Sequence, residues 1–187
     1  MARAFVLTVS DRAARGERAD ETGPRLAARL RELGHDATVG LVPDEPAQIA
    51  AAVRAAVATR RHALVVVAGG TGLGPRDVTP QALVGVLDYE IPGFGEVMRA
   101  VGRRTTPLAA LSRSLGGVVE RSLVLVVPGS PRGALESLDA VADLLPHALE
   151  TLAGADHTAR TNEVAGADEA AAGRHGPSLT TRREARP

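Results

Sequence analysis

A glycine-rich segment near the middle of this 187-residue chain carries residue types suited to holding a phosphate group. It reads Gly69-Gly70-Thr71-Gly72-Leu73-Gly74-Pro75-Arg76-Asp77 and is called the glycine loop here. Glycine has no Cβ and adopts positive φ readily, so the backbone N–H groups of such a loop can approach an anion closely. The loop therefore suits phosphate, or a pterin-like ring that bears phosphate. The alternative is a tight turn between a strand and a helix.

Two aspartates are candidates for binding a metal ion. Asp77 closes the glycine loop, and Asp44 follows an apolar run that we expect to be a strand. Mg²⁺ usually takes one or two protein carboxylates together with substrate phosphates and water, so this pair could hold Mg²⁺ against a triphosphate. Structural roles are equally open. Asp44 could cap a helix, and Asp77 could pair with Arg76 or form an Asx turn.

Three more polar residues follow expected strands. Ser10 and Asp11 come after the first apolar run, and Ser130 comes after the last. Ligands of open α/β sheets bind beyond the carboxyl ends of the strands, so these residues are expected near the glycine loop. Asp11 could instead be a turn residue. Ser130 could cap a helix that begins at Pro131, which does not exclude anion binding.

Short apolar runs predict the strands that position these residues. Residues 4–9, 63–68 and 123–127 are almost unbroken apolar stretches, and residues 37–42 are a weaker candidate. Strands of this kind are buried on both faces, which is typical of a parallel sheet between two helical layers. The residues before 123 favour an added antiparallel strand. The expected fold class is a three-layer α/β/α sandwich with a mostly parallel central sheet and one antiparallel strand.

Helical spacing of apolar residues separates these strands. It predicts helices near residues 26–33, 49–57, 81–86, 93–102 and 135–152. Thr79 is expected to cap the third of these helices, and Pro146 to split or kink the last. The patterns end near Gly154, so we expect one domain over residues 1–154. Residues 155–187 contain few large apolar side chains and are expected to be a disordered tail.

The composition excludes several classes of function. The chain has no cysteine and no lysine, which rules out a thiolate metal site, a Schiff base and a P-loop ending in lysine. Basic and acidic residues number 22 each, so there is no electrostatic case for a nucleic acid or a membrane as partner. No apolar run approaches the ~20 residues of a membrane span. A cytoplasmic location is expected for such a cysteine-free chain.

Seven motifs follow one another along the chain: Thr8-Val9-Ser10-Asp11-Arg12, Asp20-Glu21-Thr22-Gly23-Pro24, Val42-Pro43-Asp44-Glu45, the glycine loop continued through Val78-Thr79-Pro80, Ile91-Pro92-Gly93-Phe94-Gly95-Glu96, Leu111-Ser112-Arg113 and Pro128-Gly129-Ser130-Pro131. Taken together, in this order, they resemble the Mog/MoaB family of molybdenum-cofactor biosynthesis proteins, whose fold also forms the G domain of gephyrin. The glycine loop is the most specific of these motifs. The resemblance covers residues 4–154.

The resemblance implies a molybdopterin-binding fold and Mg²⁺-dependent transfer of AMP from ATP to the terminal phosphate of molybdopterin, with release of pyrophosphate. It makes Asp44 and Asp77 the catalytic carboxylates that position Mg²⁺ and phosphate. It also implies a homo-oligomer, a trimer or hexamer, and contact with other proteins of the cofactor pathway. The residues that would line the pterin and nucleotide sites are Ser10, Asp11, Gly69, Gly70, Thr71, Gly72, Gly74 and Ser130.

Two positions depart from the family pattern, and other functions stay open. Ala68 stands where threonine often precedes the two glycines, and Arg132 stands where lysine is common. Arginine keeps the positive charge but changes its geometry. The main alternative function is a pterin-binding paralogue that acts as a carrier or regulator without catalysis. Scaffolding is a weaker alternative. A nicotinamide oxidoreductase is disfavoured because the chain has no GxGxxG motif at the glycine loop.

Overall fold

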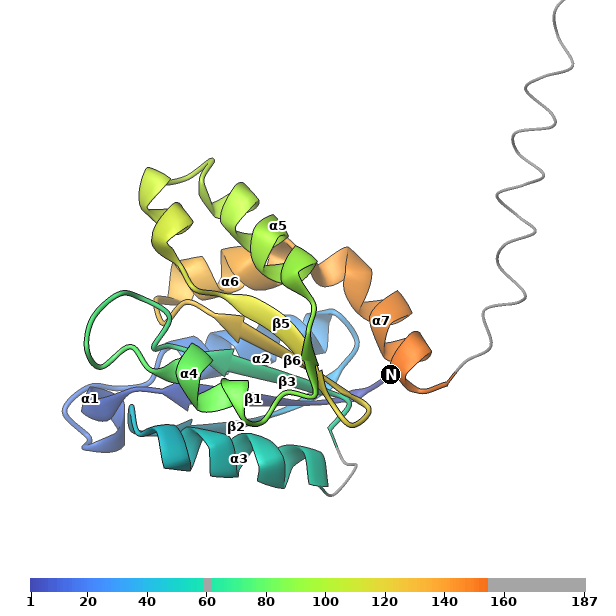
Figure 1. Cartoon of the computed structure of the whole chain (residues 1–187), viewed down its shortest axis with the longest axis horizontal. Helices are drawn as coiled ribbons and strands as arrows, with labels where there is room; N and C mark the ends of the chain where they lie inside the picture. The colour runs from blue at the N-terminus through green and yellow to red at the C-terminus, as the bar shows by residue number, and fades with distance from the viewer. Residues whose placement is uncertain (59–61, 155–187) are drawn as a thin grey trace, which may run out of the picture. The chain divides into compact units, whose positions relative to one another are not determined.

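A six-stranded mixed sheet forms the centre of this computed structural model, which describes residues 1–58 and 62–154 (Figure 1). Its strands are β1 (Arg3–Val9), β2 (Asp36–Val42), β3 (Leu64–Ala68), β4 (Tyr89–Glu90), β5 (Leu115–Val119) and β6 (Ser122–Val127). They lie in the order β2-β1-β3-β6-β5-β4. The first four in this order are parallel, while β5 is antiparallel to both of its neighbours. The predicted mostly parallel sheet with an antiparallel strand is confirmed.

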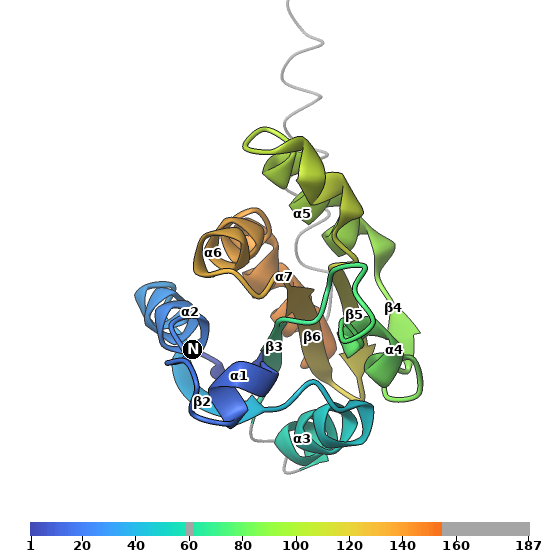
Figure 2. The same cartoon turned by 90° about the vertical axis from the view of Figure 1, so that its left-hand side faces the viewer.

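Helices cover both faces of the sheet (Figures 1 and 2). One layer contains α2 (Thr22–Glu32), α5 (Pro92–Gly102), α6 (Pro131–Asp139) and α7 (Leu145–Leu152), and the other contains α3 (Pro46–Ala58) and α4 (Thr79–Val84). Three short elements complete the described part: α1 (Asp11–Ala14), η1 (Pro107–Leu111) and η2 (Ala142–Leu144). The three-layer α/β/α sandwich is therefore confirmed.

The unbroken apolar runs form strands because both faces of those strands are covered. All five residues of β3 and all six of β6 are buried. Along β3, Leu64 and Val66 face the layer of α2 and α6, while Val65 and Val67 face the layer of α3 and α4. The edge strand β2 leaves Val39 and Leu41 exposed, which accounts for its weaker apolar pattern.

Two predictions about helix ends have different outcomes. The predicted long C-terminal helix is divided into α6 and α7, and Pro146 lies in the first turn of α7. The predicted split is confirmed, and the break lies at residues 140–144, just before the helix that contains the proline. The predicted cap at Thr79 is wrong, because Val78 occupies the cap position and Thr79 is the first residue of α4. The Thr79 hydroxyl is buried and has no hydrogen-bond partner among the described residues.

Residues Met1–Gly154 form one compact unit. The domain boundary at residue 154 stays a prediction, and the predicted tail at 155–187 lies outside the described residues. Among the helices of the described part, none is both long enough and apolar enough to cross a membrane.

Candidate active site

The parallel strands end at one edge of the sheet, and the candidate residues gather there. Ser10 follows β1, Asp44 follows β2, the glycine loop follows β3 and Ser130 follows β6. Figure 2 views the molecule from this side, with α1 and the loop between β3 and α4 toward the viewer. Ser10 caps α1, and its backbone N–H donates to the Val42 carbonyl (2.9 Å), which fixes the end of β1 against the end of β2.

The first two glycines of the glycine loop hold a backbone shape that other residues do not tolerate. Gly69 has a φ of 118° and Gly70 a φ of 61°. A Cβ on Gly69 would lie 2.3 Å from the Val9 carbonyl oxygen, far inside van der Waals contact. The next three amide N–H groups, of Thr71, Gly72 and Leu73, donate to no acceptor in the described part of the chain. These donors are available to an anion, as the loop's composition predicts.

Asp77 binds back onto its own loop. Its Oδ2 accepts the Gly74 N–H at 2.8 Å, and a Cβ on Gly72 would lie 2.7 Å from the same oxygen. The bond runs to a residue earlier in the chain, so it is not the Asx turn considered from the sequence. The salt bridge with Arg76 is not formed either. Asp77 Oδ1 has no hydrogen-bond partner among residues 1–58 and 62–154.

Asp44 and Asp11 hold each other by reciprocal backbone bonds. The Asp11 N–H donates to Asp44 Oδ2 at 2.7 Å, and the Asp44 N–H donates to Asp11 Oδ1 at 3.1 Å. Asp44 therefore joins two strand ends and does not cap α3. Burial raises the pKa of Asp44 above its ordinary value, and the negative charges of Asp11 and Asp77 act in the same direction. A bound cation would relieve this repulsion.

Arg76 connects the glycine loop to both of these strand ends. Its guanidinium donates twice to Asp11, at 3.0 Å each, and once to Glu45 at 2.9 Å. Burial alone would raise the pKa of Asp11, but the Asp44 N–H and the Arg76 guanidinium outweigh it and lower that pKa. Asp11 is thereby kept ionised and is occupied by protein donors. This arrangement favours a positioning role for Asp11 over direct contact with a substrate.

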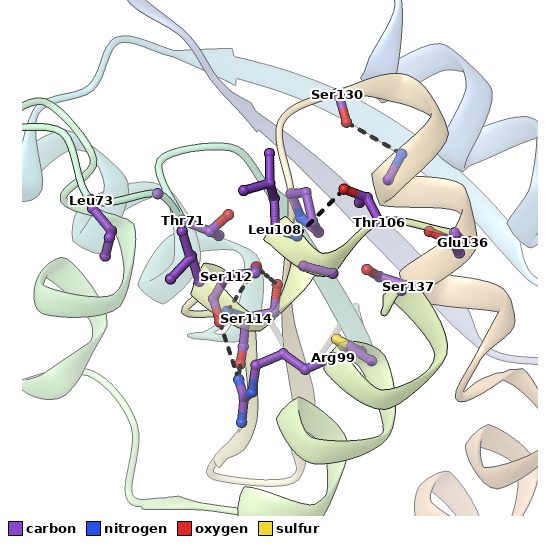
Figure 3. A pocket seen from close by; sticks show the side chains of 17 residues that line it. Thr71, Leu73, Arg99, Thr106, Leu108, Ser112, Ser114, Ser130, Glu136 and Ser137 are labelled. Atoms are coloured by element: carbon purple, nitrogen blue, oxygen red, sulfur yellow. Dashed lines mark hydrogen bonds between the residues drawn. The ribbon is translucent and has the colours of Figure 1, made fainter. Parts of the chain in front are cut away.

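Two cavities flank the glycine loop. The larger, of about 440 Å³, is shown in Figure 3 and reaches from Thr71, Gly72 and Leu73 across to Ser130 and Glu136. Its remaining walls come from α5, η1 and the residues before β5, and include Met98, Arg99, Leu108, Leu111, Ser112 and Ser114. The hydroxyls of Ser112 and Ser114 lie 2.8 Å apart.

The smaller cavity, of about 160 Å³, lies on the other side of the loop and is more polar. Its walls include Thr8, Ser10, Asp20, Thr22, Asp44, Gly69, Gly70 and Gly129. The Thr8 hydroxyl on this wall is buried and unpaired among the described residues. Because Gly69 and Gly70 face one cavity and Thr71 and Gly72 face the other, the loop separates two binding spaces. Two ligands could meet across it.

Several residues that shape this edge of the sheet were not among the site residues predicted from the sequence. Asp20 Oδ1 accepts the N–H groups of Thr22 and Gly23 at 3.0 Å each and so starts α2. The Thr22 hydroxyl donates to the Gly129 carbonyl at 2.8 Å. Arg113 donates to carbonyls of the glycine loop. All belong to matched motifs, but none directly follows a strand of the parallel set, which was the rule used to select candidates.

The two carboxylates fit a metal ion that arrives with a substrate. Among the described residues, no group of three or more histidine, aspartate or glutamate side chains could hold a metal by itself. Asp44 and Asp77 each keep Oδ1 free of hydrogen-bond partners in that part of the chain. One or two carboxylates completed by phosphate oxygens and water is the donor set that Mg²⁺ usually takes. Arg132 lines neither cavity beside the loop.

Known proteins resemble this chain over most of its length. A molybdenum cofactor biosynthesis bifunctional protein of Synechococcus elongatus is 45% identical over 155 residues, which is 82% of this chain and 48% of that protein. The chain thus spans about half the length of that relative. A molybdopterin adenylyltransferase of Haemophilus influenzae is 40% identical over 141 residues, covering 74% of this chain and 72% of the relative.

Solved structures agree with these sequence relatives. The crystal structure of the molybdopterin biosynthesis enzyme MoaB from Thermus thermophilus is 48% identical, covers 82% of this chain and 98% of that one, and has a TM-score of 0.74. The Mog protein structure from Mycobacterium ulcerans is 36% identical, with 81% and 99% covered and a TM-score of 0.77. A family model described as a probable molybdopterin binding domain matches residues 5–147. The chain therefore belongs to the molybdopterin-binding domain family of molybdenum cofactor biosynthesis proteins.

Proposed function

We propose that this chain is a molybdopterin adenylyltransferase that moves AMP from ATP onto the terminal phosphate of molybdopterin. Relatives from Haemophilus influenzae and Escherichia coli, at 40% and 38% identity, carry that name. The observation that carries the proposal is the glycine loop itself. It offers free N–H donors between two cavities, with Asp44 and Asp77 beside it.

The two cavities suit the two substrates. The larger one combines apolar walls with the hydroxyls of Ser112 and Ser114, which suits a flat, polar-edged pterin. The smaller one is bordered by Ser10, Asp44 and the first two glycines, which suits the nucleotide and its phosphates. In this arrangement the pterin phosphate and the α-phosphate of ATP meet at the glycine loop.

The reaction needs one bond to form and one to break. An oxygen of the molybdopterin phosphate attacks the α-phosphorus of ATP, the bond from that phosphorus to the oxygen bridging to the β-phosphorus breaks, and pyrophosphate leaves with the bonding electrons. The protein contributes mainly by positioning the phosphates and by stabilising their charge. The N–H groups of Thr71, Gly72 and Leu73 hold phosphate oxygens. Neither aspartate acts as a nucleophile.

Asp44 and Asp77 are the residues that would hold Mg²⁺, through the oxygens that the protein leaves unbonded. When bound, Mg²⁺ neutralises charge on the triphosphate. Burial is the main cause of the raised pKa of Asp44, and the negative charges of Asp11 and Asp77 raise it further; this repulsion supports the assignment, because a bound cation would relieve it. We further propose residues 1–154 as the catalytic domain, a trimer or hexamer as the assembly, and the cytoplasm as the location.

Pyrophosphate release tests the function. Purified full-length protein given ATP, Mg²⁺ and molybdopterin is expected to release pyrophosphate and to form adenylylated molybdopterin. Asp77→Asn keeps the side-chain shape but removes the charge, so it should abolish turnover and retain much of the pterin affinity. Asp143→Asn, an exposed change in η2, serves as the matched control and should turn over like the wild type.

The alternative hypothesis, a pterin carrier without catalysis, predicts a different result in the same experiment. Tight molybdopterin binding without pyrophosphate release, under conditions in which the Escherichia coli relative turns over, would replace the enzyme proposal with a pterin carrier or regulator.

A further inference from the structure

We propose that Arg113 is a positioning residue that shapes the glycine loop for phosphate transfer. The proposal rests on the adenylyl transfer proposed above and assigns a role within that site. Arg113 lies between η1 and β5, outside the strand-end residues from which the site was predicted. It reaches the loop because β5 is antiparallel to β6, so that the start of β5 lies at the edge where the parallel strands end.

Three hydrogen bonds join Arg113 to the glycine loop. Its backbone N–H donates to the Thr71 carbonyl at 2.9 Å, and its Nε donates to the Gly72 carbonyl at 2.8 Å. A terminal guanidinium nitrogen donates to the carbonyl of Asp77. The side chain is partly buried. Arg113 therefore binds the glycine loop both near its middle and at Asp77, its last residue.

These bonds determine which way the loop presents its donors. In a trans peptide the C=O and the N–H of one peptide group point in opposite directions. Holding the carbonyls of Thr71 and Gly72 toward Arg113 turns the N–H groups of Gly72 and Leu73 away from it. Those two N–H groups are among the donors that no described acceptor takes. Arg113 thus fixes the orientation of the proposed phosphate-binding amides.

The guanidinium fork also fixes the position of Asp77. Arg113 holds the Asp77 carbonyl, while the Asp77 N–H donates to the Gly74 carbonyl at 3.0 Å. With both sides of this residue anchored, its carboxylate stays beside the loop. A planar fork can span the Gly72 and Asp77 carbonyls together, whereas a lysine ammonium offers a point charge of different reach. None of the ion pairs within the described residues includes Arg113, so its donors serve the loop.

The test compares Arg113→Lys with Arg54→Lys in the full-length chain. Arg54 also binds a backbone carbonyl, that of Gly85 at 2.6 Å, but it joins α3 to the end of α4 and not to the glycine loop. We expect Arg113→Lys to lower kcat for pyrophosphate release by roughly 100-fold, the cost of slight misplacement of reacting groups. Both KM values should change much less, and Arg54→Lys should keep the wild-type kcat. A folded Arg113→Lys protein with kcat close to that of the wild type would overturn the proposal.

Two further measurements keep the test decisive. Amide hydrogen exchange followed by mass spectrometry should show faster exchange across residues 70–78 in Arg113→Lys than in the wild type. This readout needs no turnover, so it tests Arg113 even if the wild type releases no pyrophosphate and the proposed function fails. If Arg113→Lys does not fold, Arg113→Ala is assayed with added guanidinium ion. Restored pyrophosphate release supports the proposal, and unchanged exchange or absent rescue contradicts it.

Discussion

At the scale of single residues, the chemistry of this site depends on whether each carboxylate keeps one oxygen free of protein donors. Asp44 and Asp77 each accept a backbone N–H with one carboxylate oxygen, and the other oxygen of each has no hydrogen-bond partner among the described residues. Asp11, at the same edge of the sheet, instead accepts hydrogen bonds from Arg76 and from the Asp44 N–H. The three aspartates at this edge of the sheet thus differ in role because their neighbours differ. Asp44 and Asp77 are available to a cation, whereas Asp11 connects the strand ends to the glycine loop.

Gly69 is one of the residues on which the conformation of the glycine loop depends. We expect Gly69→Ala to lower the free energy of unfolding by roughly 3–5 kcal/mol, from a strained positive φ and overpacking together. The added methyl would meet the backbone carbonyl oxygen of Val9, a buried residue at the end of strand β1. Urea unfolding followed by circular dichroism measures the change.

Gly93 provides the matched control for that substitution. It lies in the first turn of α5, and a Cβ there would meet nothing within 4 Å. Gly93→Ala should therefore leave stability unchanged or raise it by about 0.5 kcal/mol through reduced entropy of the unfolded chain. Equal losses for the two alanine variants would show that the contact with β1 is not what requires glycine at position 69.

At the scale of elements, the site is built by joining the starts of helices to the ends of strands. Thr22, in the first turn of α2, donates to the Gly129 carbonyl in the loop between β6 and α6. Thr22 is 5% exposed, so water cannot easily replace this bond. Replacement by valine keeps the shape and removes the hydroxyl. The helix and the loop would then keep their packing but lose the polar contact between them.

We expect Thr22→Val to destabilise the protein by about 1–2 kcal/mol, because the Gly129 carbonyl would lose its protein partner. Thr38→Val is the control, since Thr38 lies exposed on the edge strand β2 and the same change there should stay within about 0.5 kcal/mol. Denaturant midpoints of the two variants give the comparison. A loss no greater for Thr22→Val than for Thr38→Val would mean that the bond contributes nothing measurable to stability.

The elements differ in how well the sequence predicts them, for physical reasons. β3 and β6 are predictable because burial on both faces demands unbroken apolar runs. The two-residue strand β4 was missed because Tyr89 and Glu90 are both exposed and show no pattern. The rule that ligands bind beyond the carboxyl ends of parallel strands brought together Asp44 and the glycine loop, but it does not apply to residues that precede an antiparallel strand. Arg113 lies there, so its place at the loop follows only from the topology.

At the scale of the whole molecule, a partly buried histidine should make global stability depend on pH. His35 lies between α2 and β2, and its Nδ1 is buried without a hydrogen-bond partner in the described part of the chain. Burial lowers the pKa of His35 below the ordinary value of 6.5, because the charged ring loses hydration. The unfolded chain therefore binds this proton at a higher pH than the folded one does.

The sign of the effect follows from this difference in proton binding. Stability rises with pH wherever the unfolded state binds more protons. The contribution of His35 is thus fully present above 6.5 and is lost as the pH falls from there through the lower pKa of the folded state. We expect the free energy of unfolding to decrease as the pH is lowered from about 7.5 to about 5, and His35→Gln, which cannot be charged, to decrease less.

Other groups titrate over the same range, so the informative quantity is the difference between the wild-type and His35→Gln curves. Groups far from residue 35 contribute equally to both proteins and cancel, because distant sites are additive to within a few tenths of a kcal/mol. Urea unfolding at a series of pH values supplies both curves. The difference should be constant above about pH 7 and should shift in favour of the glutamine variant below it. A difference that stays constant down to pH 5 would mean that the folded protein accommodates the charged imidazolium as well as water does, and the burial of His35 would then carry no penalty.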